Sequence, residues 1–199
     1  MDARPTPQAA APCAIVIFGA SGDLTKRKLI PSLYNLESYH LLPANFSIIG
    51  VARRPLSDEI FRDQLGKDLA ELGTQPVDPN LWHKFRERIS YCAGGFDDPA
   101  TYKKLREALS ESETKFGTSG NAVFYLSVQP DYFATIAKRL SEAGLLHEEN
   151  GRWRRVIIEK PFGHDLETAR KLNSQLTSVL QEHQIYRKKF QDQQSVRGL

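Results

Sequence analysis

The sequence predicts an α/β fold: a doubly wound, mainly parallel sheet with helices on both faces. Short apolar runs alternate with longer segments of helical periodicity, a pattern typical of strands joined by crossover helices. Three runs are almost continuously apolar, as expected of strands that helices cover on both sides. The five predicted parallel strands lie at residues 13–18, 46–52, 88–93, 122–128 and 155–159. The predicted architecture is therefore Rossmann-like.

Four helices are marked by residues that commonly begin them. Ser57, Asp98, Asp131 and Asp165 each carry a side-chain oxygen that can accept a hydrogen bond from an amide of the first turn. Gly144 is expected to close the third helix. Apolar stripes follow the four caps, at Ile60, Leu65 and Leu69, at Tyr102, Leu105 and Leu109, at Phe133, Ile136, Ala137 and Leu140, and at Leu166, Ala169, Leu172, Leu176 and Leu180.

Composition narrows the class of protein. The 199 residues suit one domain, and the apolar and charged fractions, 40% and 26%, are those of an ordinary globular protein. A net charge of +3 does not indicate a nucleic-acid partner, and the basic stretch 152–155 is interpreted as the solvated start of a strand. No apolar run reaches the roughly 18 residues of a membrane span, and no signal peptide is present, so a cytoplasmic location without a membrane partner is expected. Cys13 and Cys92 are interpreted as small core residues, and no metal is expected.

The stretch AIVIFGASGDLTKRKL, residues 14–29, carries the main functional signal. A strand, a tight glycine turn and a helix together place free amides and the positive end of a helix dipole against an anion. Thr25 could add a hydroxyl donor and Lys26 a charge. The candidate cofactor-binding residues are Gly19, Ala20, Ser21, Gly22, Asp23, Leu24, Thr25 and Lys26.

This turn departs from the GxGxxG pattern of dinucleotide-binding loops. Ser21 stands at the second glycine position and Leu24 at the third, so a purely structural turn stays open as an alternative. A P-loop is disfavoured because GxxxxGK[ST] is absent. Pro31 follows closely, so the first helix either bends there or begins later than the loop suggests.

The second predicted strand indicates which dinucleotide is bound. It ends in GVARRP, where an acid would accept the ribose 2′-hydroxyl of NAD and an arginine would pair with the 2′-phosphate of NADP. Arg53 and Arg54 therefore favour NADP, although two arginines before Pro55 could also form a solvated turn.

The fifth predicted strand ends in a second candidate site. In VIIEKPFG, residues 156–163, Lys160 follows a buried strand at the end where α/β enzymes place their chemistry. Lys160 is a candidate to hold a phosphate or hydroxyl of a substrate. The alternative is a structural ion pair between Lys160 and Glu159.

Taken together, GASGDLTKRKL, GVARR, VFYLSVQP and EKPFGHDLETA resemble the glucose-6-phosphate dehydrogenase family, from about Cys13 to Arg187. The resemblance implies oxidation of glucose 6-phosphate by NADP at its C1 hydroxyl to the lactone, the first step of the pentose phosphate pathway. It implies that residues 19–26 bind the cofactor diphosphate and that Arg53 binds the 2′-phosphate. It also implies that Lys160 contacts both substrate and cofactor, that the peptide before Pro161 is cis, and that full-length members form homo-oligomers.

The resemblance stops after Arg187. We expect a mobile lead at 1–12, an NADP-binding domain at 13–187 and an aberrant tail at 188–199. The family's general base is a histidine of a second domain, so no catalytic residue is assigned here and His164 is interpreted as a helix-start residue. The alternative function is an NADP-binding fragment without turnover. A short-chain dehydrogenase is disfavoured, since no tyrosine has a lysine four residues on.

Overall fold

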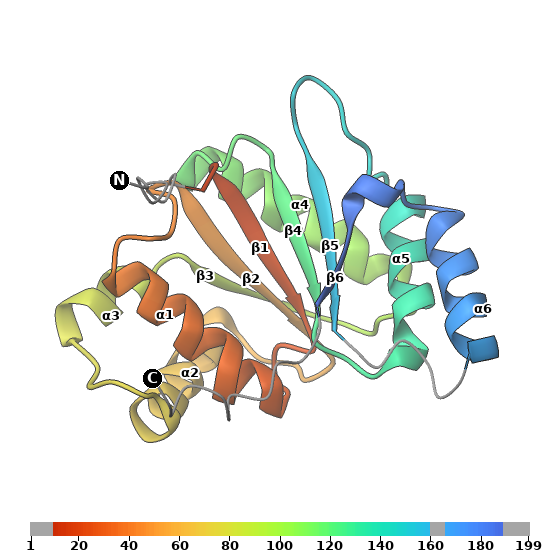
Figure 1. Ribbon diagram of the computed structural model, residues 1–199. Coiled ribbons are helices and arrows are strands. Elements are labelled where there is room, and N and C mark those ends of the chain that lie inside the picture. The colour runs from red at the N-terminus through yellow and green to blue at the C-terminus, as the bar shows by residue number, and fades with distance from the viewer. Residues whose placement is uncertain (1–9, 160–165, 189–199) are drawn as a thin grey trace, which may run out of the picture.

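The sheet has six parallel strands, with helices on both faces (Figure 1). The computed structural model describes residues 10–159 and 166–188. The strand order is β3-β2-β1-β4-β5-β6, which is the order of dinucleotide-binding Rossmann folds. The predicted fold class is thus confirmed. The strands are β1 (Cys13–Phe18), β2 (Phe46–Ala52), β3 (Ile89–Ala93), β4 (Ala122–Leu126), β5 (Arg154–Glu159) and β6 (Ile185–Lys188).

Helices separate the strands. They are α1 (Ile30–Ser38), α2 (Asp58–Leu72), α3 (Pro79–Arg86), α4 (Pro99–Phe116), α5 (Phe133–Glu142) and α6 (Leu166–Thr177). The predicted caps of α2 and α4 are confirmed, since Ser57 accepts a hydrogen bond from the Ile60 amide and Asp98 from the Ala100 amide. The predicted cap at Asp131 is wrong. This residue lies within a 3₁₀ turn, Pro130–Tyr132, which precedes α5 and whose proline can start a turn without an amide hydrogen.

The first helix, expected to bend at Pro31 or to begin late, is regular α-helix from Ile30. A turn of π-helix, Thr25–Leu29, precedes α1 and joins it without a break. Proline lacks an amide hydrogen, and its ring collides with the carbonyl four residues earlier in an α-helix. The wider π turn relieves this conflict, because the Ile30 amide bonds to the Thr25 carbonyl five residues back.

Two apolar cores lie on opposite faces of the sheet. Val16 and Phe18 of β1 face the core shared with α4, α5 and α6, whereas Ile17 faces the core shared with α1, α2 and α3. Successive side chains of a strand point to opposite faces, so a strand covered on both sides is apolar throughout. Figure 1 shows the corresponding groups of helices on either side of the sheet. Ile60, expected in a buried stripe, is 50% exposed, and its neighbour Phe61 is buried in its place.

Two elements were not predicted from the sequence. Helix α3 begins at Asp78-Pro79, the same dipeptide type that begins α4, and Asp78 accepts hydrogen bonds from the amides of Asn80 and Leu81. Strand β6 pairs in parallel with β5. It has only four residues and one buried apolar side chain among its described ones, Ile185, so it lacks the apolar run by which the other strands were found.

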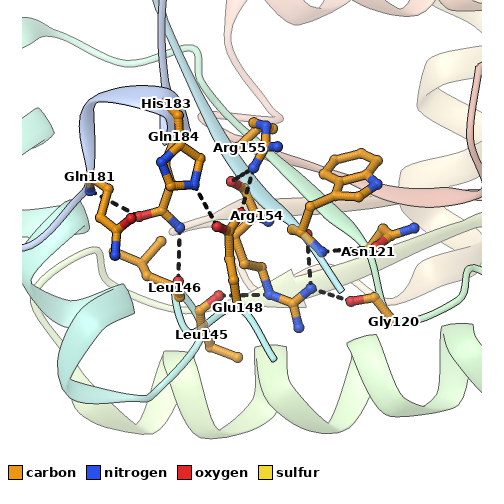
Figure 2. A network of polar contacts seen from close by, with 11 residues as sticks. Gly120, Asn121, Leu145, Leu146, Glu148, Arg154, Arg155, Gln181, His183 and Gln184 are labelled. Carbon is orange, nitrogen blue, oxygen red and sulfur yellow. Dashed lines mark hydrogen bonds and ion pairs between the residues drawn. The ribbon is translucent and has the colours of Figure 1, made fainter. Parts of the chain in front are cut away.

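A polar network at the amino ends of β4, β5 and β6 holds this side of the sheet together (Figure 2). The Arg154 guanidinium donates to the carbonyls of Leu145 and Gly120, and the Arg155 guanidinium donates to the Glu148 carboxylate. Arg152 pairs with Glu113 at 3.2 Å. Each arginine of the basic stretch is therefore bonded within the fold at the start of a strand.

The same network fixes the approach to β6. The Gln184 amide donates to the Leu146 carbonyl at 3.0 Å, and the His183 ring lies 2.6 Å from Glu148. Gln184 is buried and also accepts from the Gln181 amide, which closes a reciprocal cap. Burial raises the pKa of Glu148, but hydrogen bonds from the Arg154 amide, His183 and Arg155 outweigh it and lower that pKa to about 2.

Several sequence expectations lie outside the described residues. These are the roles of Lys160 and Pro161, the helix cap at Asp165, the role of His164, most of the lead 1–12 and most of the tail 188–199. Cys13 and Cys92 are buried free thiols, as expected. Across residues 10–159 and 166–188, no helix is long and apolar enough to cross a membrane.

Replacing Glu148 with glutamine should lower the free energy of unfolding at pH 7 by about 1–3 kcal/mol, because the ionised carboxylate is more stable folded than unfolded. Its folded pKa is depressed, so this stabilisation is fully present above the ordinary value of 4.5 and is lost as the pH falls through about 2. Urea titrations at pH 7 and pH 3 should therefore show a smaller gap between wild type and variant at pH 3.

The control is Glu149→Gln, which removes an exposed carboxylate that lies 3.6 Å from His147. Such surface pairs contribute little, so this variant should stay within about 0.5 kcal/mol of wild type. If the unfolding free energies of wild type and Glu148→Gln differ by the same amount at pH 7 and pH 3, the lowered pKa of Glu148 is contradicted.

Candidate functional site

The candidate site lies where the direction of the sheet's winding reverses. The chain builds β1, β2 and β3 in one direction and then returns to place β4 on the other side of β1. The connections that leave β1 and β4 therefore part from each other at their carboxyl ends. Open α/β sheets bind their ligands at this point.

A cleft of about 700 Å³ lies there, within the usual range for ligand pockets. It is formed by segments that follow β1, β2, β3 and β4. Its lining residues are Gly19, Ser21, Gly22, Asp23, Leu24, Ala52, Arg53, Arg54, Phe96, Ser127, Val128, Gln129 and Tyr132. The structure thus brings the predicted glycine loop and the predicted arginines to one cavity.

Gly19 allows the closest approach in this site. Its φ is +83°, and a Cβ there would lie 2.1 Å from the Ser127 carbonyl oxygen, so no other residue fits without moving the turn after β4. Its amide donates to the Val51 carbonyl of β2 at 2.9 Å. The turn after β1 is therefore held against β2 and β4 at once. Gly22 does not have a positive φ, and its amide donates back to the Gly19 carbonyl at 2.8 Å.

The glycine loop leaves amides free to bind a ligand. Within residues 10–159 and 166–188, no hydrogen-bond acceptor is found for the amides of Ser21 or Leu24. Both residues line the cleft at the start of the helical segment, where the first amides have no partner within the helix and the dipole is positive. The arrangement suits an anion such as a phosphate.

Three of the candidate cofactor-binding residues do not line the cleft. Ala20 is buried, with 1% of its surface exposed. Thr25 is fully buried, and its hydroxyl donates to the Gly19 carbonyl at 3.2 Å. The Lys26 ammonium lies 3.3 Å from the Asp68 carboxylate of α2. These three side chains therefore contact other parts of the fold and not the cleft.

Arg53 and Arg54 are both exposed at the cleft edge, just after β2. In the described part of the chain, neither guanidinium makes an ion pair, and the one carboxylate lining the cleft, Asp23, pairs with Arg27 at 2.6 Å. The Tyr91 hydroxyl donates to the Arg54 carbonyl at 2.8 Å. Burial raises the pKa of Tyr91, and the charge of Arg54 partly offsets this. The Tyr91 hydroxyl thus holds the backbone at Arg54, while both guanidinium groups are available to a ligand.

Sequence reasoning missed an aromatic wall of the cleft. Phe96 and Tyr132 pack edge to face with ring centroids 5.4 Å apart, and Phe96 also packs against Phe18 of β1 at 6.1 Å. Such a wall suits a flat ring. The signal available in the sequence was the place of Phe96, three residues beyond the end of β3, where ligand-contacting residues of such sheets are found.

The end of β5 concerns the alternative in which Lys160 forms a structural ion pair with Glu159. The Tyr125 hydroxyl of β4 donates to the Glu159 carboxylate. Burial and then this bond raise the pKa of Tyr125, so the hydroxyl stays protonated. Glu159 therefore has a partner of its own, whereas Lys160 lies outside the described residues.

None of the four histidines within the described residues lines the cleft. His83 lies 3.6 Å from Glu87 and His147 3.6 Å from Glu149, and His183 belongs to the network at the opposite end of the sheet. No group of three or more metal-ligating side chains that could hold an ion is found in the same part of the chain.

Sequence comparison gives a consistent family match. The family model described as "Glucose-6-phosphate dehydrogenase, NAD binding domain" matches residues 16–189. The chain is 42% identical over 187 residues to the glucose-6-phosphate 1-dehydrogenase of Chlamydia muridarum, which covers 92% of this chain and 37% of that protein. It is 40% identical over 173 residues to the Leuconostoc mesenteroides enzyme of the same name, which covers 87% of this chain and 35% of that protein. The chain thus spans little more than a third of these relatives.

Structure comparison agrees. A glucose-6-phosphate dehydrogenase in complex with its substrate glucose-6-phosphate matches with a TM-score of 0.79 and 32% identity, over 92% of this chain and 37% of that one. A glucose-6-phosphate 1-dehydrogenase from Mycobacterium avium matches with a TM-score of 0.76 and 34% identity, over 88% and 36%.

Gly19→Ala should destabilise the fold, because it adds a clash to the cost of a positive φ. Gly144→Ala is the matched control, since Gly144 has a φ of +68° but nothing within 4 Å of a Cβ. We expect a loss of about 1 kcal/mol for Gly144→Ala from backbone strain and about 1–3 kcal/mol more for Gly19→Ala from overpacking. Urea unfolding followed by circular dichroism measures both. Equal losses would show that the contact with Ser127 is not tight.

Proposed function

The chain belongs to the glucose-6-phosphate dehydrogenase family, as its NAD-binding domain, and from this premise we propose that it binds NADP in the cleft at the carboxyl end of the sheet. The observation that carries the proposal is the convergence of two features on one cavity. They are the amides of the glycine loop and the guanidinium groups after β2, for which the described residues provide no partner.

The residues present fit a dinucleotide. The amides of Ser21 and Leu24 would hold the diphosphate at the start of the helical segment, in a loop that Gly19 allows to pack against Ser127. Phe96 and Tyr132 offer apolar surface for a ring of the cofactor. When bound, the nicotinamide supplies hydride-accepting chemistry, while the protein binds and orients it.

The preference for NADP over NAD rests on Arg53 and Arg54. Either guanidinium can form charge-assisted hydrogen bonds to a 2′-phosphate. NAD presents a 2′-hydroxyl at the same place, and the cleft has no free carboxylate among its described residues to accept it. The arginines therefore gain a partner from NADP that NAD lacks.

The substrate proposed for the whole protein is glucose 6-phosphate, oxidised at C1 to the lactone. A solved relative was determined with glucose-6-phosphate as its substrate, and the proposed role of Lys160 is to contact this sugar phosphate beside the cofactor. Sequence residues 13–187 would act as the cofactor domain.

For the 199 residues alone, we favour cofactor binding without turnover. Oxidation of an alcohol needs a base near its hydroxyl, and no histidine of the described part lies in the cleft. Absorbance at 340 nm with NADP and glucose 6-phosphate tests this. NADPH formation by the purified chain would mean that a residue of this sequence serves as the base.

Replacing both Arg53 and Arg54 with alanine should weaken NADP binding about tenfold or more and leave NAD binding within about twofold, because charge-assisted bonds to the 2′-phosphate are lost. Calorimetric titration with each nucleotide measures both affinities. The ratio of the Kd for NAD to the Kd for NADP should also fall in the wild type as the salt concentration is raised. Both arginines are exposed, so salt screens their charges.

The matched control is Arg152→Ala, which removes one surface arginine that pairs with Glu113 and precedes the amino end of β5, away from the cleft. It should leave both affinities unchanged. Equal weakening of NADP and NAD binding by the double variant would contradict the 2′-phosphate role, and binding of neither nucleotide by the wild type would contradict the proposed function.

A further inference from the structure

We propose that Thr25 is a positioning residue for the cofactor, acting from behind the glycine loop through Gly19 and Ser127 without touching the ligand. The inference rests on the proposed function and deepens it. It differs from the direct donor role that the sequence analysis considered for this hydroxyl.

The Thr25 hydroxyl lies between the two segments that form the floor of the cleft. It donates to the Gly19 carbonyl at 3.2 Å and lies 3.4 Å from the Ser127 hydroxyl, which is 102 residues away in the sequence. Gly19 and Ser127 both line the cleft, whereas Thr25 does not. One hydroxyl therefore bridges the turn after β1 and the turn after β4.

Burial excludes a direct contact between Thr25 and the cofactor. The residue has 0% exposure, and a hydroxyl has a single hydrogen to donate. That hydrogen is used by the Gly19 carbonyl. A buried polar group without a partner is costly, so the loop conformation in which both contacts form is favoured over others.

The backbone around Thr25 reinforces the bridge. The Thr25 carbonyl accepts from the Ile30 amide in the π turn, and the adjacent Lys26 pairs with Asp68 of α2. The Ser127 amide donates to the Phe18 carbonyl at 3.0 Å. The loop is thus fastened to α2 on one side and, through Thr25, to the turn after β4 on the other.

This placement predicts a distinct pattern of affinity. The free amides that the bridge holds in place face the diphosphate, which NADP and NAD share. Loss of the Thr25 bridge should weaken the binding of both nucleotides by the same factor. Loss of the arginines, by contrast, should weaken the binding of NADP alone. The hydrogen-bonded amides of the same loop, those of Gly19, Ala20 and Gly22, exchange slowly only while the loop keeps this conformation.

Thr25→Val removes the hydroxyl while keeping the shape, and Thr25→Ser restores it. We expect Thr25→Val to raise the Kd for NADP and for NAD about fivefold, equivalent to one neutral hydrogen bond, and Thr25→Ser to stay within about twofold of wild type. Hydrogen exchange of the amides in residues 19–24, followed by mass spectrometry without ligand, should be faster in Thr25→Val than in wild type or in Thr25→Ser.

The control for general destabilisation is Ser112→Ala. Ser112 and Ser47 form another buried hydroxyl pair, between α4 and β2, and neither residue lines the cleft. This variant should lower the unfolding temperature without changing either Kd.

Three outcomes overturn the inference. One is a Thr25→Val variant that binds both nucleotides and exchanges its loop amides as wild type does. Another is a loss of NADP binding alone, which would assign Thr25 to the 2′-phosphate. The third is a loss of affinity in Ser112→Ala as large as that in Thr25→Val, which would show that the effect comes from general destabilisation. Wild-type protein that binds neither nucleotide overturns the proposed function itself.

Discussion

The contact between the turn after β1 and the turn after β4 is the constraint on which the rest of the site depends. Gly19 can lie against the Ser127 carbonyl because it has no Cβ, and its amide bonds to β2 at the same time. The loop that follows must then turn away from the sheet and begin a helix. The amides of Ser21 and Leu24 at its start then find no acceptor within the described part of the chain. An anion site thus results from the close packing of backbone segments.

The polar residues around the cleft divide into those that hold the loop and those that are left free. Thr25 and Lys26 belong to a motif that suggests direct phosphate contact, yet each is bonded to another part of the fold. Arg53 and Arg54 have no such bond to their guanidinium groups among the described residues. Charge alone did not separate the two groups. The separation depends on whether a partner within the fold lies within reach, a backbone carbonyl for Thr25 and a carboxylate for Lys26, which only the packed structure decides.

The fold was largely predictable, because strands buried on both faces must be apolar throughout and helix caps have definite chemistry. Strand β6 was not, since its place depends on the contacts of Gln184 with Leu146 and of His183 with Glu148, which form only in the folded chain. The same reason explains the cleft. Glycines and arginines could be assigned to it by their position after strands, whereas the aromatic wall of Phe96 and Tyr132 joins residues from two separate loops. The cap expected at Asp131 failed because Pro130 starts a tighter turn before the helix.

The network of Figure 2 gathers at the amino ends of β4, β5 and β6, while the cleft opens at the carboxyl ends of the strands. A parallel sheet keeps these two ends apart by the length of its strands. Substitutions in the arginine–glutamate network can therefore change thermal stability without contacting a ligand in the cleft. Substitutions in the glycine loop affect both properties, because Gly19 packs against Ser127 and also lines the cleft. Thermostabilising changes that preserve binding are therefore best sought at the amino ends of these strands.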